Sequence, residues 1–183
     1  KSHVAHMEDG DFYGSEQSYT MVNAGSLRIE YTSATGSVFP LRGAVAVKAG
    51  EMIDASVMSA AALAAFIDAQ IEDAKAKGVL FSLHLKATMM KVSDPIIYGI
   101  AVSRFYAPVL EKHPRTMAEI GFDPNNGIGD LYAKLGQLPD AQRAGIEADI
   151  AALYAQRPAL AMVNSDKGIT NLHVPSDVIV DAS

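Results

Sequence analysis

The segment from Phe81 to Pro95 constrains the fold more than any other, because it sets a strand pattern just before a helix start. Apolar residues alternate with polar ones from Phe81 to Lys86, the period of two that separates the faces of a β-strand. Ser93-Asp-Pro95 then combines a capping serine, a first-turn carboxylate and a proline suited to a helix start. A strand, a short connection and a helix are typical of the edge at which α/β enzymes carry their chemistry.

Composition limits the classes of protein to which this chain can belong. The chain has 183 residues, of which 49% are hydrophobic, enough for one packed domain or two small ones. Its formal net charge is −6, and its 15 lysines and arginines are scattered. A nucleic-acid surface needs a basic stripe, so we expect no nucleic-acid partner.

The compartment and the metal chemistry are constrained by what is missing from the sequence. It contains no apolar run long enough to cross a membrane and no charged-then-apolar leader, so we expect a folded soluble protein with the cytoplasm as its default location. With no cysteine, disulfides and thiolate zinc sites are excluded, and any metal must use oxygen or imidazole ligands. The chain starts at Lys1 and stops at Ser183, inside an apolar segment, which suggests a piece of a longer protein.

Periodicity and turn residues predict the order of the elements. Residues 1–26 read as mostly loop, and no internal repeat is present. The first expected elements are strands at Leu27–Thr32 and Val38–Lys48, joined by a turn at Gly36, with an edge or bulge at Pro40. A helix from Ser59 to Lys77, stopped by Gly78, a strand at Val79–Lys86 and a helix from Ser93 to Lys112 follow. The last are helical pieces between Arg115 and Arg157 with a cap at Asp140, and a short strand at Ala159–Val163.

Asp177 and Asp181 are a candidate metal site. They are four residues apart, a spacing that places both on one face of either a helix or a strand. Ser176 favours a helix beginning there, although Val178–Val180 favours a strand. Two carboxylates on one face would suit a hard divalent cation held by oxygen ligands. From spacing alone, two solvated aspartates are the commoner explanation.

Lys86 is the candidate catalytic residue. On the predicted strand it shares a face with Ser82 and His84. A lysine that ends a strand usually just reaches water; alternatively, desolvation or a nearby metal depresses its pKa and lets it transfer a proton. His3 and His6 have a spacing that can ligate a metal, but no predicted element fixes their geometry.

Long motifs resemble a known family. They are Lys1-Ser-His-Val-Ala-His-Met7, Gly10-Asp-Phe-Tyr-Gly-Ser-Glu16, Lys86-Ala-Thr-Met-Met-Lys-Val-Ser-Asp-Pro95, Gly121-Phe-Asp-Pro-Asn-Asn-Gly-Ile-Gly-Asp-Leu-Tyr132 and the stretch from Leu160 to Ser183. Together they resemble the monomeric type of NADP-dependent isocitrate dehydrogenase across essentially the whole chain.

The resemblance implies an activity and roles for three residues. Lys86 matches the family's active-site lysine, which contacts isocitrate and helps move its hydroxyl proton. Asp181 matches a direct ligand of Mg²⁺ or Mn²⁺, and Asp177 matches its acidic partner. Wider relatives carry Gly-Asn after the lysine where this chain has Ala87-Thr88, so no role is borrowed from that asparagine.

The resemblance also implies a longer parent enzyme. The implied fold is α/β, a mixed sheet flanked by helices that forms half of the large domain. Other isocitrate-binding residues, a further metal aspartate and most of the NADP site belong to parts of the family's enzyme outside residues 1–183. We therefore expect the isolated chain to be inactive, to need the rest of its polypeptide, and to self-associate through an uncovered apolar face. The alternatives are a shortened non-catalytic paralogue that binds metal and carboxylates, or a structural fragment.

Overall fold

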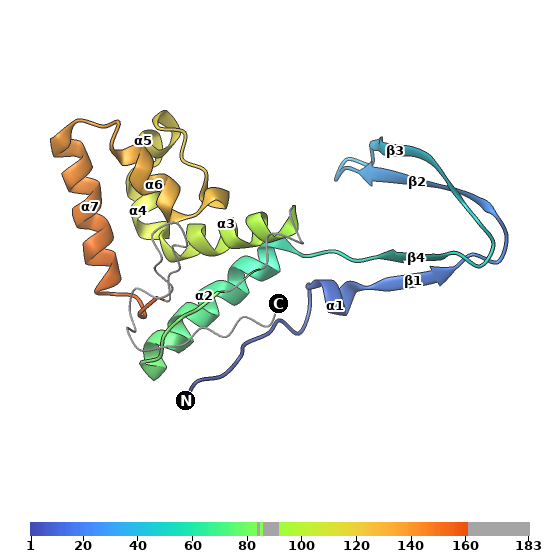
Figure 1. Cartoon of the computed structure of the whole chain (residues 1–183), viewed down its shortest axis with the longest axis horizontal. Coiled ribbons are helices and arrows are strands. Elements are labelled where there is room, and N and C mark those ends of the chain that lie inside the picture. The colour runs from blue at the N-terminus through green and yellow to red at the C-terminus, as the bar shows by residue number, and fades with distance from the viewer. Residues whose placement is uncertain (84, 86–91, 161–183) are drawn as a thin grey trace. The chain divides into compact units, whose positions relative to one another are not determined.

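The computed structural model describes residues 1–83, 85 and 92–160 (Figure 1). They form two compact units: Glu8–Met58, and Lys1–Met7 together with the described residues from Ser59 on. Both helices and strands are present, as predicted for an α/β chain. A mixed sheet flanked by helices stays a prediction, because the two sheets within the described residues are two-stranded and antiparallel. In the same part of the chain, no helix is both long and apolar enough to span a membrane.

The unit Glu8–Met58 starts with a single helical turn, α1 (Phe12–Ser15), in which the Gly14 N–H donates to the side chain of the N-cap residue Asp11. Strand β1 (Gln17–Thr20) then pairs antiparallel with β4 (Met52–Ala55). Residues 1–26, read as mostly loop, thus contain one turn of helix, one short strand and the first two residues of β2.

The long hairpin of this unit lies between those two strands in the sequence. Strand β2 (Gly25–Thr32) pairs antiparallel with β3 (Val38–Val47), which confirms both strands predicted there. Gly36 adopts a φ of 82° in the turn, a conformation that glycine reaches without strain. The register shifts twice between Leu27 and Glu30, and Glu30 lies opposite Pro40, the predicted edge or bulge residue.

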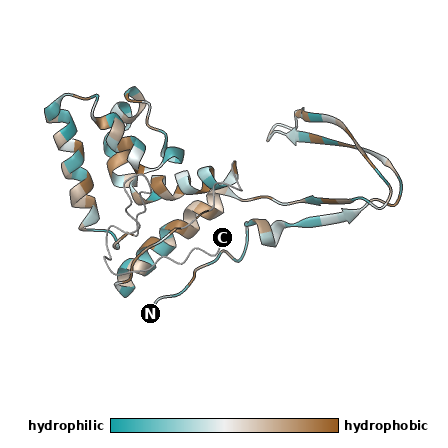
Figure 2. Ribbon diagram, in the orientation of Figure 1, coloured by the Kyte–Doolittle hydropathy of each residue, from teal (hydrophilic) through white to brown (hydrophobic). Residues whose placement is uncertain are grey.

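The β2–β3 hairpin carries exposed apolar side chains, of which Tyr31 and Phe39 share one face. Figure 2 shows hydrophobic stretches along its ribbon. The rings of Tyr31 and Phe39 lie opposite each other with centroids 6.1 Å apart, while Ile29 and Leu41 follow at a spacing of two and are 53% and 68% exposed. A two-stranded hairpin is marginal in water unless something covers its apolar face. The hairpin therefore needs a covering surface.

We expect the isolated 183-residue chain to self-associate at micromolar concentration, because a second copy can cover this face. Light scattering across a dilution series should show an apparent mass that rises with concentration. The variant Tyr31→Lys/Phe39→Glu should shift that rise to higher concentration. A monomer at every concentration would show that the hairpin is stable uncovered.

Helix α2 (Ala60–Lys77) begins and ends where the sequence predicted. The Ser59 hydroxyl accepts a hydrogen bond from the Ala62 N–H at 3.2 Å, an N-cap interaction generally worth about 1 kcal/mol. Gly78 ends the helix in the left-handed conformation. The buried face repeats at intervals of three and four residues and comprises Leu63, Ile67, Ile71 and Ala74.

The helix expected from Ser93 to Lys112 is two helices, α3 (Ser93–Phe105) and α4 (Ala107–Lys112). The uninterrupted helix was wrong because Pro108 has no N–H to donate to the carbonyl of Arg104, and its ring would clash with that carbonyl. Ser93 is the first helical residue and not the cap, a position that Val92 occupies. Proline at the second position of α4 is compatible with a fresh helix start.

The remaining helices complete the unit's core. They are α5 (Pro114–Glu119), the short 3₁₀ helix η1 (Pro124–Asn126), α6 (Ile128–Leu135) and α7 (Asp140–Tyr154). The expected cap Asp140 is the first residue of α7 itself, after Pro139. Five large side chains are fully buried between these helices and α2: Ile71, Leu131, Leu135, Ile146 and Ile150.

Candidate functional site

The two segments that lead toward the predicted site residues meet at one point. The Phe81 N–H donates to the carbonyl of Ala159 at 2.7 Å, and Phe81 and Leu160 form an isolated parallel bridge. At this bridge, the chain that continues to Lys86 runs beside, and in the same direction as, the chain that continues to Asp177 and Asp181.

The strands predicted on both sides of this bridge are shorter than expected. Within the described part of Val79–Lys86, only Phe81 pairs with another segment, so the strand predicted there was wrong in its extent. Alternation alone could not reveal this, because a strand needs a partner along its whole length. Of Ala159–Val163, the described residues contribute only the bridge at Leu160.

The predicted site residues themselves fall outside the described part of the chain. Lys86, Asp177 and Asp181 are among them. The nearest described neighbours of Lys86 are Leu85 on one side and Val92 on the other. The roles of Lys86, Asp177 and Asp181 stay predictions.

An aromatic cluster supports the bridge. The ring of Phe81 stacks on that of Phe105 with centroids 6.4 Å apart, and Phe105 in turn packs against Tyr106 and Tyr154. A hollow of about 50 Å³ remains beside Phe81, lined mainly by apolar side chains. The described residues that line it carry no charged side chain, so it is a packing feature.

Two tyrosine hydroxyls in this cluster bond to each other. The hydroxyls of Tyr106 and Tyr154 are 2.6 Å apart and link the start of α4 to the end of α7. Burial, and then this hydrogen bond, raise the pKa of Tyr106 far above its usual value. Tyr106 therefore stays protonated at neutral pH and holds helices together instead of transferring protons.

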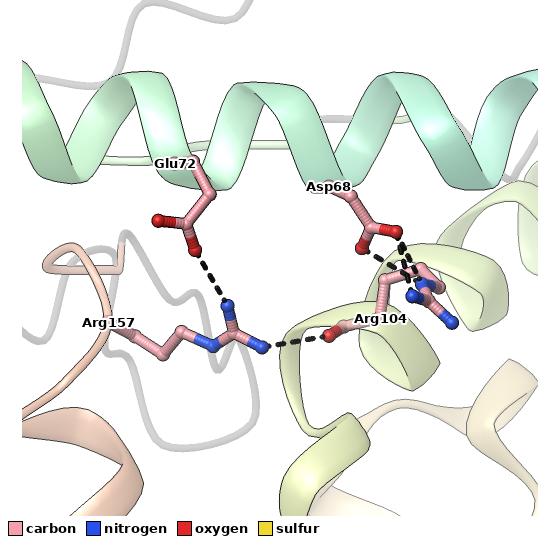
Figure 3. A network of polar contacts seen from close by, with 4 residues as sticks. All are labelled: Asp68, Glu72, Arg104 and Arg157. Carbon is pink, nitrogen blue, oxygen red and sulfur yellow. Dashed lines mark hydrogen bonds and ion pairs between the residues drawn. The ribbon is translucent and has the colours of Figure 1, made fainter.

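Two arginines tie the bridge region to α2 (Figure 3). Arg104, in the last turn of α3, holds Asp68 in a bidentate pair with contacts of 2.7–3.0 Å. Arg157 lies three residues after α7. It donates to Glu72 at 3.3 Å and to the carbonyl of Arg104 at 3.4 Å. The sequence analysis missed both, although Pro108 was a signal that the Arg104 carbonyl needs another donor.

A third charged group joins α4 to α7. Asp149 accepts hydrogen bonds from Lys112 at 2.7 Å and from His113 at 2.6 Å. Lys112 first, and then His113, hold the pKa of the Asp149 carboxyl below its usual value. A depressed carboxyl pKa stabilises the fold above the ordinary carboxyl range, and this stabilisation is lost as the pH falls through the lowered value.

His3 lies close to an acidic side chain of α2. Its Nε2 is 3.6 Å from a carboxylate oxygen of Asp73, on the wall of a hollow of about 380 Å³ between the N-terminal residues, α2 and residues 79–83. Among the described residues, no three His, Cys, Asp or Glu side chains gather to hold a metal. His3 and His6 are therefore not proposed as ligands.

The described residues form an α/β chain in which two segments far apart in the sequence meet at one parallel bridge. The sequence model of the family described as monomeric isocitrate dehydrogenase matches residues 1–183. The chain belongs to this family.

Individual relatives agree with the family model over the whole chain. The chain is 64% identical to isocitrate dehydrogenase [NADP] of Azotobacter vinelandii, 58% to isocitrate dehydrogenase [NADP] 2 of Colwellia maris and 47% to isocitrate dehydrogenase [NADP] 2 of Mycobacterium tuberculosis. Each alignment covers 100% of this chain and 25% of the relative. The chain thus spans a quarter of the length of these curated relatives.

Proposed function

We propose that this chain is the part of an NADP-dependent isocitrate dehydrogenase that supplies a catalytic lysine, Lys86, and two metal-site aspartates, Asp177 and Asp181. The complete polypeptide oxidises isocitrate and releases carbon dioxide to give 2-oxoglutarate. Family membership over all 183 residues is the observation that carries this proposal. The parallel bridge between Phe81 and Leu160 supports it, because it brings together the described residues from which the two site segments start.

The residues fit a hard divalent metal. Asp177 and Asp181 offer carboxylate oxygens, the ligands that Mg²⁺ and Mn²⁺ prefer, and the chain has no thiolate that would select a softer ion. We propose that Asp181 binds the metal directly and that Asp177 assists it. When bound, the metal supplies a fixed positive charge next to the oxygen that becomes negative during the reaction.

Lys86 is proposed to handle the proton of the substrate. The hydride leaves C2 of isocitrate for NADP while the hydroxyl proton leaves for a base, and the resulting oxo acid then loses its β-carboxylate as carbon dioxide. A lysine beside a cation is less readily protonated than one in water. Its amine is therefore suited to accept the hydroxyl proton or to relay it.

The partners follow from this assignment. Isocitrate is the substrate, and the rest of the same polypeptide provides the other substrate contacts and most of the NADP site. The acidic composition supports the absence of a nucleic-acid partner. A cytoplasmic location and the absence of a membrane partner are proposed on the sequence alone.

Turnover of the full-length enzyme tests the proposal. With isocitrate, NADP and Mn²⁺ we expect formation of NADPH, 2-oxoglutarate and carbon dioxide in equal amounts, and its loss when a chelator removes the metal. Restoring Mn²⁺ should restore the rate. Metal and isocitrate binding without turnover would instead indicate the non-catalytic paralogue, and absence of both would indicate a structural fragment.

A further inference from the structure

The turn that precedes α6 carries the pair Asn126-Gly127. An asparagine followed by glycine loses its side-chain amide faster than other asparagines do, because glycine has no side chain to shield its backbone nitrogen. The other asparagines of the sequence precede alanine, asparagine, serine and leucine. Asn126 is therefore the asparagine of this chain with the highest intrinsic reactivity.

The reaction needs no partner other than water. The Gly127 nitrogen bonds to Cγ of Asn126 while the Cγ–Nδ2 bond breaks, and the backbone proton leaves with the side-chain nitrogen as ammonia. The product is a five-membered succinimide ring. Water then opens the ring at either carbonyl and leaves aspartate or isoaspartate, so no group is oxidised or reduced.

The η1 turn opposes the first step in three ways. The Gly127 N–H donates to the carbonyl of Pro124 at 3.0 Å, and the attacking nitrogen must give up this proton. Gly127 is buried although Asn126 is exposed, so a base from solvent reaches the side-chain amide but not the nucleophile. The ring also requires the nitrogen to eclipse Cβ of Asn126, whereas the ψ of a 3₁₀ helix, about −20 to −30°, holds it to one side.

An N-cap and close packing on α3 hold the turn in this conformation. The Asp123 carboxylate accepts a hydrogen bond from the Asn125 N–H at 2.9 Å and so caps η1. The Asn125 side chain lies so close to Gly99 of α3 that a Cβ there would collide with it. A Cβ on Gly127 would lie 3.1 Å from the ring of Tyr98. The turn therefore cannot rearrange without leaving α3.

We propose that Asn126-Gly127 is a site of spontaneous modification that the fold protects: the succinimide forms when η1 opens and leaves α3. Isoaspartate inserts an extra methylene into the backbone, so the turn cannot re-form the hydrogen bond between Gly127 and Pro124. Modification therefore converts a transient opening into a permanent one. Neither step involves the residues proposed for catalysis or metal binding.

Ageing of the full-length enzyme at mildly alkaline pH measures the protection. Pepsin digestion at acid pH, followed by mass spectrometry, gives the fractions of aspartate and isoaspartate at position 126. The native enzyme should convert at least about tenfold more slowly than the same enzyme unfolded in urea, because the reaction requires a local opening. Equal rates would overturn the proposal, and so would an unfolded enzyme that does not convert at Asn126.

Removal of the cap tests whether η1 provides the protection. Asp123→Ala should speed conversion in the native enzyme about fivefold, the factor that corresponds to a typical cap. The matched control is Asp11→Ala, which removes the cap of α1 in the other unit and should change the rate less than about twofold. A folded Asp123→Ala enzyme with the rate of the parent, or an equal increase in both variants, would overturn the proposal.

Hydrogen exchange keeps the test decisive if Asp123→Ala does not fold, as judged by circular dichroism. In low concentrations of urea, exchange in the peptide that contains η1 and conversion of Asn126 should accelerate by the same factor in the parent enzyme. Parallel acceleration supports the proposal. Exchange that accelerates without conversion would overturn it, because opening of the turn would then not release the reaction.

Discussion

Lys86→Met in the full-length enzyme is expected to lower turnover by about 10²–10⁴, the range for loss of a general acid or base. Methionine keeps an unbranched apolar stem of similar length but cannot carry the proton. Arginine should not rescue the rate, because a guanidinium stays protonated at every accessible pH. The measurement is steady-state NADPH formation at saturating isocitrate and Mn²⁺.

Lys77→Met is the matched control. Lys77 lies in the last turn of α2 and pairs with Asp73 on the exposed surface, so its loss should change turnover by less than about twofold. A Lys86→Met enzyme that is folded and nearly as fast as the Lys77→Met enzyme would return Lys86 to the role of a solvated strand-end residue.

The isolated 183-residue chain is expected to form no NADPH from isocitrate and NADP. The remaining isocitrate contacts and most of the NADP site are proposed to lie in the rest of the polypeptide, and holding reactants in register is worth about 7–11 kcal/mol of the barrier. The assay compares the isolated chain with its own Lys86→Met variant at equal Mn²⁺. Metal-dependent NADPH formation above that variant would show that residues 1–183 contain a complete active site.

Local chemistry made part of the fold predictable. Ser59 and Gly78 mark the two ends of α2 through capping and the left-handed conformation, and neither depends on distant residues. The β2–β3 hairpin followed from β-branched and aromatic residues on both sides of Gly36. In each case the signal and the structure it produces lie within the same short stretch of chain.

Features that depend on distant partners were not predictable. Phe81 makes a single described bridge because its pairing depends on Leu160, 79 positions further along, which alternation cannot reveal. The end of α3 depends on Pro108, and the carbonyl released there is met by Arg157 from beyond α7. Such contacts are set by the tertiary packing of α2, α3 and α7, not by local periodicity.

The candidate site was predicted from resemblance more than from spacing. The four-residue interval between Asp177 and Asp181 is common on solvated surfaces, and a strand-end lysine usually just reaches water. The long motifs around Lys86, Asp177 and Asp181 favoured a functional role for all three residues, and family membership supports the same assignment. Spacing alone could not have distinguished a metal site from an exposed acidic pair.

Anomalous diffraction at the manganese edge, from crystals of the full-length enzyme with Mn²⁺ and isocitrate, tests most directly whether this chain supplies the metal and proton-transfer groups. We expect a manganese peak about 2.0–2.6 Å from a carboxylate oxygen of Asp181, the range for hard cations bound by oxygen. Asp177 should lie beside it, and the Lys86 amine should face the substrate hydroxyl. A manganese peak and isocitrate bound away from all three residues would contradict the proposed role of this chain.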